Sequence, residues 1–429
     1  MSYFYQGEIF VQPQKRSWIH NWSPALAWSF VPLGLSIFTG FGSRISWSAN
    51  ARWIGFLLLT AYGFFNWALR RKWKLTSFDY FAFFIFGFIF LVSIVFSEFL
   101  GIYKALSCLL VYFYLTWGVG SLIKSFDHVT AVLEKFLLTV TGLLGIGLLG
   151  NLSGFIPAIG GAPSGIFLNP NGTASCAIIF LPLAIWFLSF KKKFKIFRYI
   201  PIFVILVVIV LSGARTPWVG IFAFTIYSVL CWDRYLRKSL YSTYSYLAIL
   251  VSLVIFAYIL FADTSSFRTF SENFFQSLND PAGGITSYRT SLVWPLYIAE
   301  IKRSFVSLFF GHGWGSEEVF LIQNRAVNPL LARTNIGTAH SAYIGLTYQI
   351  GLIGSLLTFG ALWFLVIKNF LDFSKPIDKV HFQLRLAISG MILVALCTAL
   401  FETGVYNMGA VHAVPTWFAV YLIIRSKNF

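Results

Sequence analysis

The sequence predicts an all-α, polytopic membrane protein with about twelve transmembrane helices. Of its 429 residues, 58% are hydrophobic, 19% are aromatic and only 11% are charged, and the mean hydropathy is +0.75. An ordinary soluble protein carries about 25% charged residues. The apolar residues come in blocks of about 20, which is the length that a helix needs to cross roughly 30 Å of hydrocarbon. This composition excludes a soluble enzyme, a membrane barrel and a disordered chain.

The expected spans are apolar runs bounded by charged residues. Twelve such runs cover residues 24–41, 53–69, 78–97, 101–123, 132–151, 173–190, 199–212, 216–232, 245–262, 343–367, 384–403 and 409–425. We therefore expect a single integral membrane domain over residues 1–429. The polar start of the chain lacks the short apolar segment and cleavage site of a removable signal peptide. An even number of spans predicts that both termini lie on the same side.

The distribution of Lys and Arg predicts which side that is. One set of alternate connections holds 22 of the 32 basic residues, and the other set holds 10. Cytoplasmic loops carry the excess of Lys and Arg, so both termini are expected in the cytoplasm. The net charge of +17 follows from this topology, and it requires no nucleic-acid partner.

The four cysteines predict neither a metal site nor a disulfide framework. All of them lie inside apolar runs, and no pair has CxxC spacing. We therefore expect them to be small core residues, and we expect no metal.

One connection between the predicted spans is far longer than the others. Residues 263–339, between spans 9 and 10, form an expected external, periplasmic subdomain with six acidic and six basic residues. Loops of this length are usually functional or disordered, and the aromatic content here favours order. The apolar spacing of residues 291–301 predicts a helix within this segment.

The first candidate site residue is Arg215. It lies in the sequence SGARTP at 212–217, which is too short between two apolar runs to be anything but an external hairpin. Thr216 and Pro217 suit the start of a helix. A guanidinium beside a helix N-terminus can bind an anion, although an arginine here can also extend to lipid headgroups.

Two further candidates, His340 and Arg289, border or lie within the long external segment. The imidazole of His340 suits a general base at ambient pH, whereas a capping or packing role is the alternative. Arg289 lies in an aromatic neighbourhood with Trp294, where it can bind a phosphate or stack on a sugar; a solvent-exposed arginine is the alternative. We expect Trp294 and Tyr343 to contribute to substrate binding.

Three weaker signals lie on the same predicted side. Asn171, in an Asn-Pro-Asn-Gly turn, can hydrogen-bond sugar hydroxyls, although turn chemistry alone explains its neighbours. The GHGWG sequence at 311–315 lacks the strand and helix of a dinucleotide fingerprint, so tight backbone turning is expected, and Glu402 and Tyr406 lie at the last external hairpin. Glu98 and Lys104 flank a short connection and are expected at most to pair as surface ions.

The order of these motifs resembles the O-antigen ligase and polymerase superfamily, whose members are membrane glycosyltransferases of the GT-C type. The resemblance covers roughly residues 160–410 and is carried by the segments FLNPN (167–171), LSGAR (211–215), GHGWG (311–315), AHSAY (339–343) and YQIGLIG (348–354). Members of this family more often have Asn directly after the histidine, where this chain has Ser341.

The resemblance implies transfer of a glycan from an undecaprenyl diphosphate carrier to an acceptor at the outer face of the bacterial inner membrane. Arg215 and Arg289 would hold the diphosphate and His340 would activate the acceptor hydroxyl, with no cofactor or metal. The acceptor would be a lipid A core for a ligase of lipopolysaccharide biosynthesis, or another repeat unit for a polymerase. Attack on the anomeric carbon opposite the diphosphate would invert that centre.

Two other classes of protein remain as alternatives to this interpretation, a transporter and a noncatalytic scaffold. A transporter or flippase typically has internal repeats with interrupted helices in both halves, and no such correspondence is found. A noncatalytic scaffold would leave Arg215 and His340 dispensable.

Overall fold

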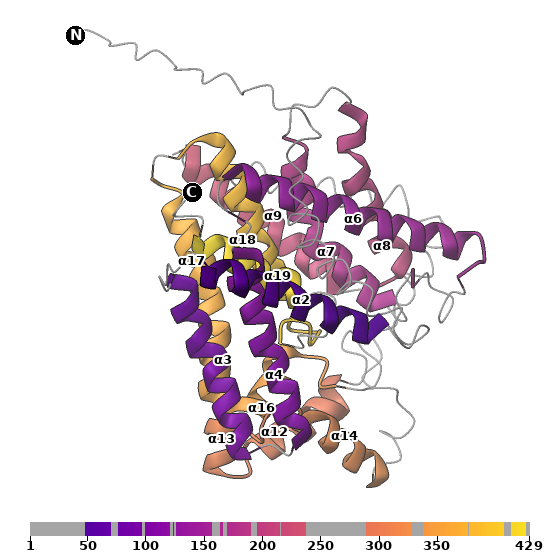
Figure 1. The fold of residues 1–429 in the computed structure, drawn as a ribbon. Coiled ribbons are helices and arrows are strands. Elements are labelled where there is room, and N and C mark those ends of the chain that lie inside the picture. The colour runs from indigo at the N-terminus through magenta and orange to yellow at the C-terminus, as the bar shows by residue number, and fades with distance from the viewer. Residues whose placement is uncertain are drawn as a thin grey trace.

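The computed structural model describes residues 48–69, 76–96, 99–120, 123, 126–156, 164–165, 170–189, 195–214, 216–236, 289–327, 338–375, 377–406 and 413–425. Within these ranges every regular element is a helix (Figure 1), which confirms the all-α prediction. The first half contains α2 (Ser48–Leu69), α3 (Ser77–Phe96), α4 (Phe99–Phe113), η2 (Tyr114–Val119), α6 (Phe126–Leu152), α7 (Pro170–Phe187), η3 (Lys195–Arg198), α8 (Ile200–Ser212) and α9 (Thr216–Leu236).

The second half begins inside the predicted external segment. It contains η4 (Arg289–Val293), α12 (Trp294–Ile301), α13 (Phe305–Phe310), α14 (Ser316–Val327), α16 (Ala342–Ser355), η5 (Leu356–Gly360), α17 (Ala361–Asp372), α18 (Lys379–Thr398) and α19 (Ala413–Arg425). The helix expected within 291–301 is therefore present as α12.

Five helical stretches are long and apolar enough to cross a membrane. They are Ser77–Phe96, Phe126–Leu152, Pro170–Phe187, Ala342–Asp372 and Lys379–Thr398, and four shorter apolar helices accompany them. The chain is thus a multi-pass membrane protein by the length and composition of its helices. The count of twelve spans stays a prediction, because the expected spans at 24–41 and 245–262 lie outside the described residues.

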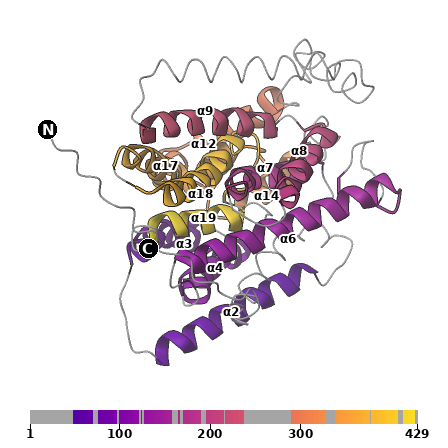
Figure 2. The ribbon, with the colours of Figure 1, turned by 90° about the horizontal axis from the view of Figure 1, so that it is seen from above.

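Helices α7 and α18 form the centre of the bundle. In their most apolar windows 78% and 72% of the residues, respectively, are buried inside the protein. A helix that is apolar on all sides is expected in such a position. Helix α18 packs against α7, α9, α17 and α19, and Figure 2 shows α9 and α2 on opposite flanks of this core.

Lipid-facing character appears on the outer helices. On α3, for example, Phe83 and Phe84 are 71% and 70% exposed, although their neighbours Ala82 and Phe86 are buried. Exposed phenylalanines on the outside of the bundle are stable in contact with hydrocarbon, whereas in water they would favour aggregation.

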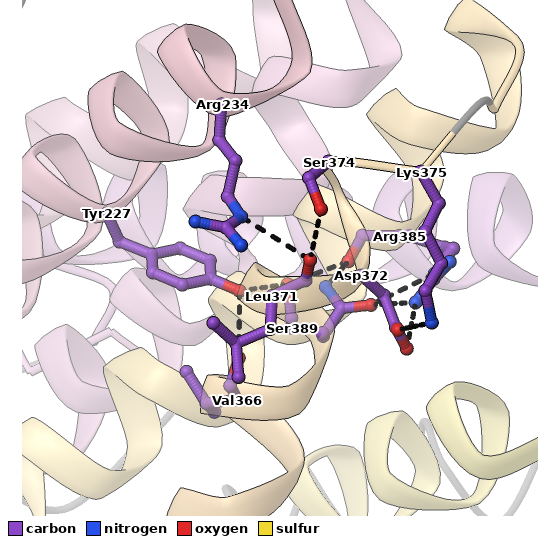
Figure 3. A network of polar contacts seen from close by, with 10 residues as sticks. Tyr227, Arg234, Val366, Leu371, Asp372, Ser374, Lys375, Arg385 and Ser389 are labelled. Atoms are coloured by element: carbon purple, nitrogen blue, oxygen red, sulfur yellow. Dashed lines mark hydrogen bonds and ion pairs between the residues drawn. The ribbon is translucent and has the colours of Figure 1, made fainter. Parts of the chain in front are cut away.

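A polar network joins α9, α17 and α18 at the end of the bundle that is predicted to face the cytoplasm (Figure 3). Arg385 donates to Asn369 Oδ1 from Nε at 2.9 Å and from Nη2 at 2.6 Å, and Nη2 lies 3.7 Å from Asp372 Oδ2. The Tyr227 hydroxyl donates to Ser389 at 3.0 Å. These contacts are internal to the packing of the three helices, so we assign the network a structural role.

The opposite end of the bundle carries α12, α13 and α14, which gather around the start of α16 and the ends of α3 and α4 (Figure 1). This end contains most of the polar residues singled out in the sequence.

Candidate functional site

The site is built around the short segment Thr338–Ser341, which leads into α16. His340 has a φ of 50°, in the left-handed region that non-glycine residues rarely adopt. The residue before it, Ala339, is fully buried, and both polar groups of its backbone are bonded by side chains. The Ala339 amide donates to Glu317 Oε1 at 2.5 Å, and its carbonyl accepts from Trp294 Nε1 at 2.9 Å.

Arg289 is the first residue of η4, and its side chain contacts the turn that follows α18. Its Nη1 donates to the carbonyl of Phe401 at 2.7 Å, and its Nη2 lies 3.8 Å from Glu402 Oε1. Only 12% of the Arg289 side chain and 15% of the Glu402 side chain are exposed. The Ala342 amide donates to the carbonyls of Ala399, at 2.7 Å, and Glu402, at 3.1 Å, so the turn after α18 also holds the start of α16.

The positive charge of Arg289 acts on both neighbouring titratable groups. Burial, and secondarily Arg289, lowers the pKa of His340 to about 4. Burial raises the pKa of Glu402 to about 7, although the charge of Arg289 opposes this shift. His340 is therefore neutral at physiological pH, which is the state in which an imidazole can accept a proton.

A second buried carboxyl group, Glu317, lies under the same segment. Its side chain is 5% exposed, and Oε2 accepts from the Tyr406 hydroxyl at 2.6 Å and from Gln349 Nε2 at 3.1 Å. Burial raises the pKa of Glu317, whereas the hydrogen bonds from the Ala339 amide and the Tyr406 hydroxyl act in the opposite direction. The other side of the Gln349 amide, Oε1, accepts from the Gly315 amide at 2.7 Å.

The GHGWG turn is fitted to an interruption in α16. Ile350 and Gly351 leave helical geometry, and Gly351 has a φ of 68°. The amides of His312 and Gly313 donate to the carbonyls of Tyr348, at 3.0 Å, and Gln349, at 2.8 Å. The interruption frees the carbonyls of Tyr348 and Gln349 from helical hydrogen bonds, and the GHGWG turn supplies donors for them. In a membrane protein, such backbone groups must find their partners within the protein. The tight turning expected for 311–315 is confirmed, because all three glycines have positive φ.

A cavity of about 600 Å³ opens beside these residues. Its polar lining includes Glu317, Thr338, Gln349 and Tyr406, whereas α2 and α4 contribute an apolar wall with Trp53, Leu57, Leu109, Leu110 and Phe113. A cavity of this size with a few convergent polar groups is typical of a ligand site.

Lys104 also lines the cavity and pairs with Glu318 at 2.7 Å. The sequence suggested Glu98 as its partner, and Glu98 lies outside the described residues. No local pattern distinguishes Lys104 from a surface lysine, so its place at the cavity depends on tertiary structure.

The structure brings together three of the predicted site residues: Arg289, Trp294 and His340. Tyr343 lies in the first turn of α16, and its hydroxyl accepts from Trp363 Nε1 at 3.0 Å and donates to the Leu396 carbonyl at 3.3 Å. Its ring stacks on Phe359 at 4.0 Å between centroids. The Tyr343 side chain is therefore engaged in the packing of α16 against the following helices.

The remaining two predicted residues lie on other helices or outside the described ranges. Asn171 is partly buried in the first turn of α7. Arg215 is not among the described residues, but α9 begins at the next position, Thr216. A Cβ placed on Gly220 of α9 would lie 3.3 Å from the Thr398 side chain, so this end of α9 packs near the turn that contains Phe401 and Glu402.

Glu317 was not predicted as a site residue, because only the folded chain reveals its position. In the sequence it is one of two adjacent glutamates after a glycine-rich turn, and nothing there separates it from Glu318. Within the described ranges, no group of three or more His, Cys, Asp or Glu side chains is suited to a metal ion.

Comparison with known protein families gives a match that covers part of the chain. Residues 200–359 match the sequence model of the family described as O-antigen ligase. This range contains Arg289, Trp294, Glu317 and His340, and it confirms the resemblance to the O-antigen ligase and polymerase superfamily. A search of the curated proteins finds no match.

Proposed function

We propose that this chain, a member of the O-antigen ligase and polymerase superfamily, is a membrane glycosyltransferase that uses an undecaprenyl diphosphate-linked glycan as donor. The glycan is transferred to an acceptor hydroxyl at the outer face of the cytoplasmic membrane, and both termini of the chain lie in the cytoplasm. The observation that carries this proposal is the burial of Arg289 with a neutral His340 in a segment that is bonded to the cavity lining: Thr338 and Glu317 line the cavity, and Glu317 accepts from the Ala339 amide.

In the proposed reaction, the acceptor oxygen attacks the anomeric carbon of the donor glycan. The bond from that carbon to the diphosphate oxygen breaks, and its electron pair stays with the leaving diphosphate. The acceptor proton passes to the neutral imidazole of His340. Because attack and departure occur on opposite faces, the anomeric configuration inverts; an NMR assignment of retained configuration in the product would contradict this step.

The role of Arg289 in this scheme is electrostatic. Negative charge develops on the diphosphate as it leaves, and a guanidinium in a water-poor site stabilises it strongly. Arg215, the arginine that the family resemblance assigns to the same task, is proposed as its partner. Removing one such electrostatic group typically lowers the rate about 10²- to 10³-fold.

The apolar wall of the cavity supports a lipid-linked substrate. A polyprenyl chain is favoured against the α2 and α4 side chains, and the polar lining of the same cavity includes Thr338, two positions before His340. The acceptor is either a lipid A core, for a ligase, or a second repeat unit, for a polymerase.

Complementation of a deletion strain tests the proposal. The chain and its Arg289→Ala, Arg215→Ala and His340→Ala variants are expressed at equal levels, and lipopolysaccharide is separated on gels. Arg303→Ala is the matched control, because that guanidinium is 74% exposed and pairs with Glu300. We expect long chains with the unchanged protein and the control, and their loss in the three variants.

The form of the residual polysaccharide distinguishes the two acceptors. Carrier-linked polymer without attached chains indicates a ligase, whereas a core bearing a single repeat indicates a polymerase. Unchanged polysaccharide in all three variants would overturn the enzymatic proposal in favour of a transporter or scaffold.

A further inference from the structure

The backbone directly before His340 is fixed from two helices by side chains. The amide of Ala339 is bonded to Glu317 on α14, and its carbonyl is bonded to Trp294 on α12. Side-chain hydrogen bonds to backbone groups are common in proteins. Here both polar backbone groups of one buried residue, the amide and the carbonyl of Ala339, are bonded by side chains that lie 22 and 45 positions away in the sequence.

This double attachment coincides with the left-handed conformation of His340. A non-glycine residue keeps such a φ only where the surrounding structure determines it strongly. The Ala342 amide, two residues later, is bonded to the turn after α18. The imidazole therefore projects from a backbone that is held on both sides.

Glu317 is itself fixed in position. Tyr406 and Gln349 donate to Oε2, which leaves Oε1 directed at the Ala339 amide. Gln349 is in turn bonded to Gly315 next to the interruption in α16. This chain of contacts connects the glycine-rich turn, the interrupted helix and the histidine segment.

We propose that Glu317 is a positioning residue for His340, which acts by holding the Ala339 amide rather than by contributing its charge to the reaction. The proposal rests on the proposed function, in which His340 accepts the acceptor proton. A displacement of about 1 Å at a reacting group can lower a rate about 10²-fold, so fixing this segment has kinetic consequences.

Two conservative substitutions distinguish the effect of the length of the Glu317 side chain from the effect of its charge. Glu317→Gln keeps the length of the side chain and an oxygen that accepts from the Ala339 amide. It removes the charge, and it replaces Oε2, the acceptor of Tyr406 and Gln349, with an NH2 group. Glu317→Asp keeps the carboxylate but shortens the side chain by one methylene, so the oxygen draws back from the amide. If Glu317 positions the histidine, the glutamine variant must retain more function than the aspartate variant.

The first measurement is independent of catalysis. Hydrogen–deuterium exchange is followed in peptides that cover residues 338–343, with the full chain in nanodiscs. We expect about tenfold faster exchange in Glu317→Asp, because one hydrogen bond to a charged group is lost, and less than about threefold change in Glu317→Gln. Glu300→Ala, which removes an acid of the same external segment, is the matched control and should leave this exchange unchanged.

The second measurement is transfer from a polyprenyl diphosphate-linked glycan in vesicles. We expect Glu317→Asp to lower kcat about tenfold or more with donor KM changed less than about twofold, since Arg289 is untouched, and Glu317→Gln to restore most of kcat. Trp294→Phe removes the hydrogen bond to the Ala339 carbonyl and should also speed exchange of residues 338–343. If Glu317→Asp fails to fold, exchange in Trp294→Phe tests whether the bonds to Ala339 hold this segment.

The proposal is overturned if exchange of residues 338–343 is unchanged in both Glu317→Asp and Trp294→Phe, or if Glu317→Gln is as impaired as Glu317→Asp. A change confined to donor KM would also overturn it. Full activity of His340→Ala would instead refute the base role in the proposed function, and the exchange results would be unaffected by that outcome.

Discussion

At the scale of single residues, the proposed chemistry depends on a histidine that stays neutral next to a cation. Burial and the charge of Arg289 both disfavour the imidazolium form, so the pKa of His340 falls to about 4. Glu402, on the other side of the guanidinium, has a raised pKa of about 7 because it is also buried. Glu402 is thus only partly ionised near pH 7 and neutralises Arg289 only in part, which fits the proposed role of this guanidinium toward a diphosphate.

The lowered pKa predicts how the rate of transfer depends on pH. A base must be unprotonated, so activity that requires neutral His340 is lost only as the pH falls through the folded pKa near 4. A histidine with an ordinary pKa near 6.5 would instead be about 90% protonated at pH 5.5, and the rate would fall about tenfold. We expect kcat/KM at pH 5.5 to stay within about twofold of its value at pH 7.5.

The control for this pH profile is Glu402→Gln, which removes the carboxyl group beside Arg289 whose pKa of about 7 lies in this range. Its profile between pH 5.5 and 7.5 should be as flat as that of the unchanged chain. A fall with a midpoint near pH 6.5 in both proteins would contradict the assignment of His340 as a buried, neutral base.

Sequence reasoning reached part of this site. Arg289 and His340 were predicted because each is an ionisable side chain in an apolar, aromatic segment on the external side. An ionisable group in apolar surroundings is energetically costly, so its presence indicates a functional site. The position of Glu317 follows from contacts with residues 22 and 89 positions away in the sequence, and no local pattern contains that information.

At the scale of elements, the interruption of α16 organises the site. It directs the carbonyls of Tyr348 and Gln349 to the GHGWG turn, and it brings the Gln349 side chain to Glu317. The apolar run at 343–367 was predicted as one continuous span, because Gly351 looks no different there from Gly345 or Gly354. Gly351 differs from these glycines because its backbone packs directly against the backbone of residues 309–311, leaving no room for a side chain. Hydropathy cannot reveal this contact.

Substitution of Gly351 tests this arrangement. A Cβ at this position would lie 2.2 Å from the Phe309 carbonyl carbon, and the φ of 68° disfavours a side chain independently. We expect Gly351→Ala to destabilise the protein by about 3 kcal/mol or more and to lower the midpoint of thermal unfolding by about 5 °C or more. The measurement is tryptophan fluorescence of the detergent-solubilised chain on heating.

The matched control is Gly360→Ala in the same membrane segment. No heavy atom lies within 4 Å of a Cβ built there, and the residue has helical φ and ψ of −60° and −41°. Equal unfolding midpoints for the two variants would contradict the close packing of the interrupted helix against α13.

At the scale of the whole molecule, the two ends of the bundle differ in chemistry. One end carries α12–α14, the cavity and the buried Glu317 and Glu402, and the other carries the polar network of α9, α17 and α18 (Figures 1 and 3). The sequence predicted this division from the excess of Lys and Arg in alternate connections. The helical class was predictable from composition, whereas the depth of α7 and α18 in the core depends on packing among helices of similar hydropathy.

Cysteine labelling tests the orientation. Arg303 and Lys375 are matched positions, since their side chains are 74% and 73% exposed at opposite ends of the bundle. The native cysteines described as buried are Cys108, Cys176 and Cys231. We expect a membrane-impermeant maleimide to label Arg303→Cys in intact spheroplasts, and to label Lys375→Cys only after the membrane is permeabilised. If only Lys375→Cys is labelled before permeabilisation, the topology is the opposite of the predicted one.

The most direct test of the central claim is a transfer assay with the purified chain in vesicles, supplied with a polyprenyl diphosphate-linked glycan and an acceptor. The quantity measured is the release of the free polyprenyl diphosphate together with formation of the new glycosidic product. Our account predicts release and product in equal amounts with the unchanged chain, and a decrease of about 10²-fold or more in both with Arg289→Ala and with His340→Ala. Undiminished product formation by both variants would contradict it.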